Sequence, residues 1–559
     1  MRNFHIVTFV WEYLSSKKSR DSFLLNLKSN WLFSISAAGF FYLNMKYSIG
    51  DFIGFLIAFG MILLLSSLIS NIFQKMMKKN IYILFFSILS SIGVCIENGS
   101  MFYKYWNRSE VINLISNFHS FQHNPIKIVT VILIVVSIYF VAIIIDVILN
   151  YIIESLEKSK ILSNTSIIEL ISYILIFSIF VITMFYIFNL TQAFYGTDNM
   201  YNVIYTSDSP ALVKEKVYAY LKHNENDLRQ PLFAIFSAPF TGFVYLINRI
   251  FHTSATINAF LINVCQLALI FLANILLANL LQLNRIKRII FVFFVSCTYT
   301  SLLFSVMMEQ YIFAYFWLIF VIFEIMVYSR PSFISMNAAI GTLITSASIF
   351  VSSKQKKESV FHFIKELILT GVDFLILLLL FDRFDIIYNI KEKIIQLSGF
   401  SGEHITFQNK LAQFTYFIHD LFIGPNTATR ITTENNWHLA PIGDYSIIGI
   451  GILVIVLISV LINYRDKMSL IAGFWVFFSV VMLLILGWGT QENGLILYAL
   501  YFGWAYFVLV YRFVEKFAKI FRISFIVPIV FGIAIFVLLY KNVPAMMDMI
   551  KFAVQVYPV

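Results

Sequence analysis

Long apolar segments recur along almost the whole chain and constrain its fold more than any other feature. Each is about as long as the roughly 20 residues that a helix needs to cross the hydrocarbon core of a bilayer. The chain has 559 residues, of which 60% are hydrophobic and 13% charged. A water-soluble fold of this composition would have too few polar side chains to cover its surface. We therefore expect an all-α fold, a polytopic membrane bundle.

About thirteen segments meet this length criterion for membrane-spanning helices. Their centres lie near Ala37, Leu63, Phe86, Val136, Phe177, Leu269, Phe293, Phe316, Ile376, Val454, Val480, Tyr501 and Ile533. A further segment, residues 333–351, carries Ser, Thr and Gly and is flanked by basic residues on both sides. A re-entrant hairpin or two short helices would satisfy that pattern. The external loops are expected to carry short amphipathic helices.

Basic residues gather in alternate short loops, as the positive-inside rule expects of cytoplasmic loops. They include residues 17–20, 75–79, 158–160, 285–288, 465–467 and 512–522. This distribution predicts a multi-pass protein of the cell membrane with a cytoplasmic N-terminus. The net charge of +10 then indicates contact with anionic membrane lipid, and no nucleic-acid partner is needed to explain it.

The pattern divides the chain into four predicted regions. Residues 1–165 would form an N-terminal accessory bundle of about four spans, and residues 166–382 a core with a catalytic external loop. Residues 383–445 would form an external loop region, and residues 446–559 the C-terminal transmembrane helices.

A polar island interrupts the apolar pattern in the long loop after the fifth span. It consists of Tyr205–Pro210 and His223–Phe233, and it contains three acids, one histidine and one arginine beside the membrane. Polar side chains at a membrane boundary cost free energy unless they are solvated, paired with one another or part of a functional site. The predicted topology places the island on the non-cytoplasmic side, together with the turn at Glu309, residues 384–445 and the turn at 487–494.

These residues resemble the GT-C glycosyltransferases, polytopic enzymes that take a sugar from a polyprenyl-phosphate carrier. The resemblance covers roughly residues 167–540 and depends on Asp198 in Tyr195-Gly-Thr-Asp-Asn, on Asp208, on the run Asn226–Phe233 and on Met308–Tyr311. It implies that an acid of the first long external loop of the core is the catalytic base, and that transfer inverts the anomeric carbon. Both Asp208 and Asp198 meet that description, so either could be the base.

The chemistry of such a transfer suggests further site residues. A carboxylate must remove the proton of the acceptor hydroxyl, and cationic or donor groups must hold the departing phosphate. Arg229, Arg430 and His438 are candidates for the phosphate, and Trp437 could stack on a sugar. The remaining substrate-binding candidates are Asp227, Gln230, Glu309 and Glu492.

Each candidate also has a structural interpretation. Asp208-Ser-Pro210 is equally typical of a helix N-terminus leading into Ala211–Lys216, and Asp198 lies in a turn-like sequence. Pro231 could simply open a helix from Leu232 to Ala238. Glu309 could be a solvated turn acid, and Arg430, His438 and Glu492 could be ordinary polar residues of loops.

Two other functions remain open from the sequence. A transporter or flippase of lipid-linked saccharides usually shows an internal repeat, and we find none; a glycopolymer polymerase or ligase would differ mainly in the size of its donor. No zinc-like spacing of ligands occurs, so no metal site is expected, although the acids of the 191–233 loop could hold a divalent cation. The expected partners are the polyprenyl-phosphate-linked sugar, a glycan or lipid acceptor of the cell envelope, and membrane lipid.

Overall fold

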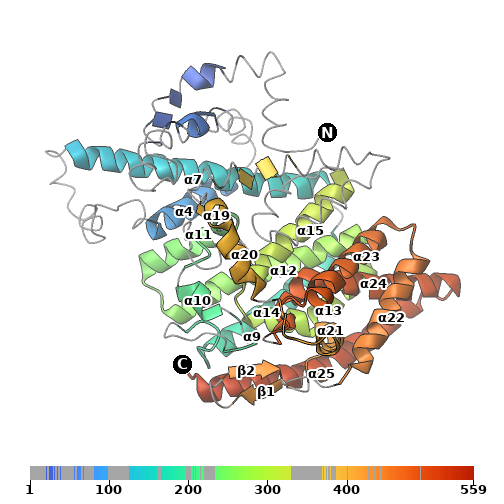
Figure 1. The fold of residues 1–559 in the computed structure, drawn as a ribbon. Helices are drawn as coiled ribbons and strands as arrows, with labels where there is room; N and C mark the ends of the chain where they lie inside the picture. Colours follow the sequence, from blue (N-terminus) through green and yellow to red (C-terminus); the bar gives the residue numbers. More distant parts are fainter. Residues whose placement is uncertain are drawn as a thin grey trace. The chain divides into compact units, whose positions relative to one another are not determined.

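The computed structural model (Figure 1) describes most of the chain from residue 81 onward. The described residues are 81–98, 125–159, 161, 165–196, 203–219 except 206, 208 and 215, 233–328, 385–399, 401–425, 428–431, 436–439, 444–491 and 493–559, with scattered positions in 21–38, 56–67 and 368–378. The predicted re-entrant segment, residues 333–351, lies outside them, as do the basic loops at 17–20 and 75–79.

The described part of the chain is mostly helical, and several helices are long and apolar enough to cross a membrane. Five meet this criterion individually: α9 (Ile167–Phe188), α12 (Ala255–Leu280), α23 (Lys467–Ser479) continued by η2 (Val480–Ile485), η3 (Leu495–Tyr498) continued by α24 (Ala499–Ile520), and α25 (Ile526–Val556). A sixth span results if α13 (Arg285–Ser296) and α14 (Tyr299–Val306), which meet at a bend of 64°, are counted together. The number thirteen therefore stays a prediction.

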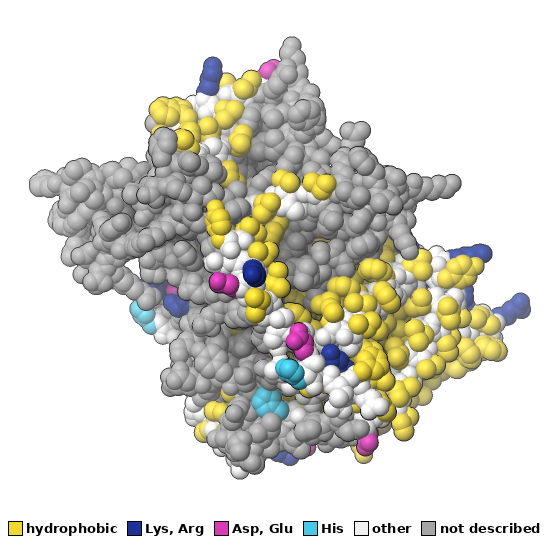
Figure 2. Space-filling view, in the orientation of Figure 1, with side chains coloured by type: hydrophobic (Ala, Val, Ile, Leu, Met, Phe, Trp, Pro, Cys, Tyr) yellow, Lys and Arg dark blue, Asp and Glu magenta, His cyan; other side chains and the backbone are white. Residues whose placement is uncertain are grey.

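A shorter apolar helix, α22 (Ile447–Ile462), carries apolar side chains along its exposed face, as lipid contact requires. On α22, Ile447 is 86% exposed and Leu461 72% exposed, and Ile450, Val454 and Leu457 complete a stripe along the helix. Figure 2 shows hydrophobic side chains over the region of α22 and α23, with few charged ones among them. In water this face would be unfavourable, whereas in hydrocarbon it needs no cover.

The chain divides into two compact units, each made of separate stretches of sequence. The first comprises Met1–Lys160, Glu215–Ser254 and Tyr328–Ile390, and the second comprises Ile161–Lys214, Ala255–Val327 and Lys391–Val559. The polar island is thereby split, because residues 205–210 belong to the second unit and residues 223–233 to the first.

The first unit is built around a close crossing of α4 (Ile81–Glu97) with α11 (Phe233–Phe251). A Cβ atom at Gly93 would lie 2.0 Å from the carbonyl oxygen of Gly242, so only glycine allows this approach. Small residues at such crossings are typical of helix pairs in membranes. Helix α11 extends well beyond the predicted Leu232–Ala238 helix, because its later turns have a packing partner in α4 that periodicity alone does not reveal. The long helix α7 (Pro125–Lys158) also packs on α4.

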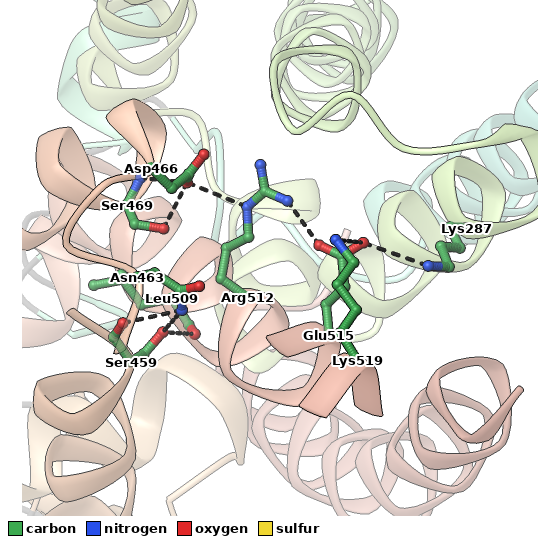
Figure 3. A network of polar contacts seen from close by, with 9 residues as sticks. All are labelled: Lys287, Ser459, Asn463, Asp466, Ser469, Leu509, Arg512, Glu515 and Lys519. Carbon is green, nitrogen blue, oxygen red and sulfur yellow. Dashed lines mark hydrogen bonds and ion pairs between the residues drawn. The ribbon is translucent and has the colours of Figure 1, made fainter. Parts of the chain in front are cut away.

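In the second unit, successive long helices run in alternating directions, so their termini meet at two ends. Ion pairs mark one of them, which we call the basic end: Glu169 with Arg288, Lys287 with Glu515, and Arg512 with both Asp466 and Glu515. Figure 3 shows the guanidinium of Arg512 between the two carboxylates, with Lys287 on the other side of Glu515. Lys519 is also paired with Glu515. These pairs connect the first turns of α9, α13 and α23 with the last turns of α24.

The opposite end of the second unit, which we call the hairpin end, carries different contacts. Thr191, just after α9, donates to the carbonyls of Ala553 and Tyr557 at the end of α25. Tyr195 is hydrogen-bonded to Thr256 at the start of α12, 3.0 Å away. A short antiparallel hairpin, β1 (Ala428–Ile431) and β2 (Asn436–Leu439), also lies there and packs Trp437 on Phe552 of α25. The all-α expectation did not include this hairpin.

A polar helix reaches from the hairpin end into the bundle. Helix α21 (Phe407–Phe422) lies in the region predicted to be an external loop, yet its last turns are buried. Asn542, midway along α25, donates to the carbonyls of Phe422 and Cys297 and accepts from the N–H of Gly424. Cys297 lies at the bend between α13 and α14, so Asn542 supplies hydrogen bonds to backbone that regular helix leaves unpaired.

The contact between α21 and α22 predicts opposite effects for two neighbouring glycines. A Cβ atom at Gly449 would lie 1.8 Å from the carbonyl oxygen of Thr415, whereas one at Gly451 meets nothing within 4 Å. Gly449→Ala should therefore lower the free energy of unfolding by about 1–3 kcal/mol through overpacking. Gly451→Ala should raise it by about 0.4–1 kcal/mol, because alanine restricts the unfolded chain. Thermal unfolding of both variants in detergent tests this contact, and equal shifts would contradict it.

Candidate active site at the hairpin end

Strand β2 joins three segments that are far apart in the sequence. On one edge it pairs with β1, with Arg430 opposite Trp437 and Thr429 opposite His438. On the other edge, Trp437 accepts a backbone hydrogen bond from Tyr205 and donates one to Val203, at 2.8 and 2.7 Å. At its end, the carbonyl of Leu439 accepts from the Asn493 side chain at 3.4 Å. The residues around 205, 428–431, 436–439 and 493 thus meet at one place in the second unit.

The side chain of Tyr205 anchors its segment to the bundle. Its hydroxyl lies 2.7 Å from the hydroxyl of Tyr299, the first residue of α14, and accepts from Trp437 Nε1 at 3.2 Å. The backbone of Tyr205 has φ 50°, a left-handed conformation that is unfavourable for a bulky residue. Such strain persists only where surrounding contacts enforce it, and it is concentrated at functional sites. The next described residues, Ser207 and Ser209, are both buried.

A buried acid–histidine pair lies beside this tyrosine pair. On α21, His419 Nδ1 is 2.7 Å from Asp420 Oδ1, and the two residues are 7% and 2% exposed. Burial raises the pKa of the Asp420 carboxyl to about 6, and the hydrogen bond from His419 lowers it in part. Burial also raises the pKa of the Tyr205 phenol, and the charge of Asp420 raises it further. The cluster therefore contains a carboxyl that changes its charge near neutral pH.

The structure places only some of the predicted site residues. His438 lies half-buried on β2, and Arg430 lies on β1, although its side chain is not described. Glu309 is 3% exposed, between α14 and α15 (Gln310–Tyr328), so it is not the solvated turn acid that one interpretation predicted. The other six candidates lie outside the described residues: Asp198, Asp208, Asp227, Arg229, Gln230 and Glu492. The helix predicted after Asp208 is present as α10 (Ser209–Lys214).

Sequence reasoning missed His419 and Asp420, which the fold buries. His419 and Asp420 lie in Phe-Ile-His-Asp-Leu-Phe, and two adjacent polar residues inside an apolar run were the available signal. Tyr205 was part of the polar island, but its ring had no predicted role.

Comparison with known proteins identifies no relative of this chain. No protein-family model, curated protein or solved structure matches the chain. Any function must therefore be argued from the chain itself.

Proposed function

We propose that this protein is a membrane glycosyltransferase that moves a sugar from a polyprenyl-phosphate carrier to a cell-envelope glycan or glycolipid. The main support is the meeting of three segments at β2, since each contains or adjoins a residue type that the reaction needs. The segment 203–209 contains Asp208, and the hairpin contains Arg430 and His438. The turn at 487–494 contains a second acid, Glu492.

The proposed topology follows from the two ends of the second unit. Lys287, Arg288, Arg512 and Lys519 belong to the basic end, which we assign to the cytoplasm by the positive-inside rule. The hairpin end then faces the other side of the membrane. This assignment agrees with a cytoplasmic N-terminus and with a bundle of about thirteen spans.

In the proposed reaction, the acceptor hydroxyl attacks the anomeric carbon while the bond from that carbon to the phosphate oxygen breaks. The electron pair of that bond leaves with the polyprenyl phosphate, and a carboxylate takes the proton of the hydroxyl. Negative charge grows on the phosphate, so cations such as Arg430 and His438 would stabilise it. Attack opposite the leaving group inverts the anomeric carbon.

We assign the proton-accepting role to Asp208, with Asp198 as the alternative. Support for Asp208 comes from its chain neighbours: Ser207 and Ser209 are 2% and 1% exposed, and Tyr205 is anchored to β2 and to α14. A general base is efficient only when it is held at a fixed distance from the proton that it removes.

The experiment is a product assay with the purified full-length protein in liposomes. The liposomes contain lipid-linked sugars labelled in the sugar, and an envelope-glycan extract supplies acceptors. A glycosyltransferase forms a new glycosidic bond, which mass spectrometry detects as a mass increase of one sugar on the acceptor. If labelled lipid instead crosses the bilayer without any new bond, the protein is a transporter and the proposal is wrong.

A further inference from the structure

The His419–Asp420 pair is the most deeply buried acid–histidine contact among the described residues, and nothing in the proposed transfer uses it directly. The pair lies near the bend between α13 and α14, where Tyr299 begins α14 and Thr300 donates to the carbonyl of Leu421 at 3.0 Å. Burying a charge is costly unless the charge has a partner. A carboxylic acid kept at such a place calls for an explanation beyond packing.

The contacts around the pair lead toward the proposed site. Asp420 interacts electrostatically with Tyr205 and Tyr299, and the hydroxyls of these tyrosines are hydrogen-bonded to each other. Tyr205 in turn accepts from Trp437 on β2 and donates its backbone N–H to the same residue. The charge of Asp420 thus acts on the two tyrosines, and hydrogen bonds lead from Tyr299 through Tyr205 to the strand that carries His438.

We propose that His419 and Asp420 form a positioning pair that holds Tyr205, Tyr299 and Trp437 in place for the transfer reaction. This inference rests on the proposed function and assigns two further residues to its site. The ionised carboxylate of Asp420 accepts the Nδ1–H of His419, which fixes the ring and leaves Nε2 as its second polar atom. The negative charge also orients the hydroxyl dipoles of the two tyrosines. Protonation of Asp420 weakens both effects.

The titratable groups facing Asp420 come from three elements. His419 on the same helix, Tyr205 from the segment before α10, and Tyr299 from α14 are the titratable neighbours that its contacts identify. Among the residues that lie against the last turns of α21, Gly449 of α22, Gly503 and Phe507 of α24 and Asn542 of α25 are uncharged. Since the pKa of Asp420 is about 6, its carboxyl is mostly ionised above that pH.

The test compares the pH dependence of transfer in four purified full-length proteins: wild type, Asp420→Asn, His419→Gln and Thr300→Val. In wild type, kcat should fall about tenfold in total as the pH drops through 6, the pKa of Asp420, and then level off, because the protonated carboxyl resembles the amide of Asp420→Asn. Asp420→Asn should lack this acid limb, with kcat lowered about tenfold at pH 7.5 and KM for the donor unchanged. His419→Gln should lower kcat to a similar extent. Thr300→Val removes an uncharged hydrogen bond beside Asp420, so it should lower stability and keep the acid limb.

A second measurement follows the effect of the pair on Trp437 and does not depend on the transfer reaction. The fluorescence of Trp437, obtained as the difference between each protein and its Trp437→Phe counterpart, is followed from pH 5 to pH 8. We expect a transition near pH 6 in wild type and none in Asp420→Asn. A missing wild-type transition, or an acid limb that persists in Asp420→Asn, overturns the inference. Absence of any glycosidic product from wild type overturns the proposed function alone, because the fluorescence transition still decides the role of the pair.

Discussion

Asp208→Asn is expected to lower the rate of glycosyl transfer by about 10²–10⁴-fold, the range that a general base contributes. The amide has nearly the shape of the carboxylate but cannot take the proton of the acceptor hydroxyl. KM for the lipid-linked donor should change little, because Asp208 acts on the acceptor. Initial rates with the purified protein, measured under saturating donor, give this number directly.

Two matched variants make the result specific. Asp444→Asn changes an exposed acid near the start of α22 and should leave the rate within about twofold, as most surface substitutions do. Asp198→Asn tests the other acid of the same loop. A full loss in Asp198→Asn together with normal activity in Asp208→Asn would move the base to Asp198, and normal activity in both would remove that loop from the chemistry.

Arg288→Leu is expected to destabilise the protein by about 3–5 kcal/mol, the cost of leaving a buried charge without its partner. Arg288 Nε and Nη2 donate to the two carboxylate oxygens of Glu169 at 2.7 and 2.8 Å, and the Glu169 side chain is fully buried. Without Arg288, the Tyr173 hydroxyl and the backbone N–H of Ser166 are the hydrogen-bond donors that remain to this carboxylate, and neither carries a charge. The folded fraction after heating in detergent measures the loss.

An exposed ion pair provides the comparison. Lys551 and Asp548 lie 3.4 Å apart with side chains 71% and 65% exposed, so Lys551→Ala should have little effect on the heating curve. The double variant Glu169→Gln, Arg288→Leu should recover part of the stability lost in Arg288→Leu, because no unpaired charge remains. Equal heating curves for Arg288→Leu and Lys551→Ala would show that the basic end does not depend on this pair.

The sequence predicted the helices whose apolar runs are long and uninterrupted. Helices lie at the predicted centres near Phe177, Leu269, Phe293, Tyr501 and Ile533, since burial in lipid makes hydropathy a direct signal. It did not predict the length of α11 or the insertion of α21. Both depend on partners distant in the chain: Gly242 needs Gly93 opposite it, and the end of α21 needs Asn542. The periodicity of a single segment cannot show which distant residue it will contact.

The sequence selected the chain segments that form the candidate site, but not the buried residues that support them. The pattern of loops selected the stretches around Asp208, His438 and Glu492, and described neighbours of all three meet at β2. Asp420 went unrecognised because the sequence places it in a loop region, whereas the fold buries it beside Tyr205. A residue that acts by supporting another is visible only when both are placed in space.

Photocrosslinking of the donor tests the location of the site most directly. Tyr445 and Tyr464 flank α22 and are 45% and 57% exposed, and its 16 residues separate them by about 24 Å. A photoreactive phenylalanine analogue replaces one or the other, and a short-chain prenyl-phosphate sugar is added to the protein in detergent. We predict that the labelled sugar attaches at position 445, near the hairpin end, and not at position 464, near the basic end. Attachment at position 464 alone would contradict the proposed site.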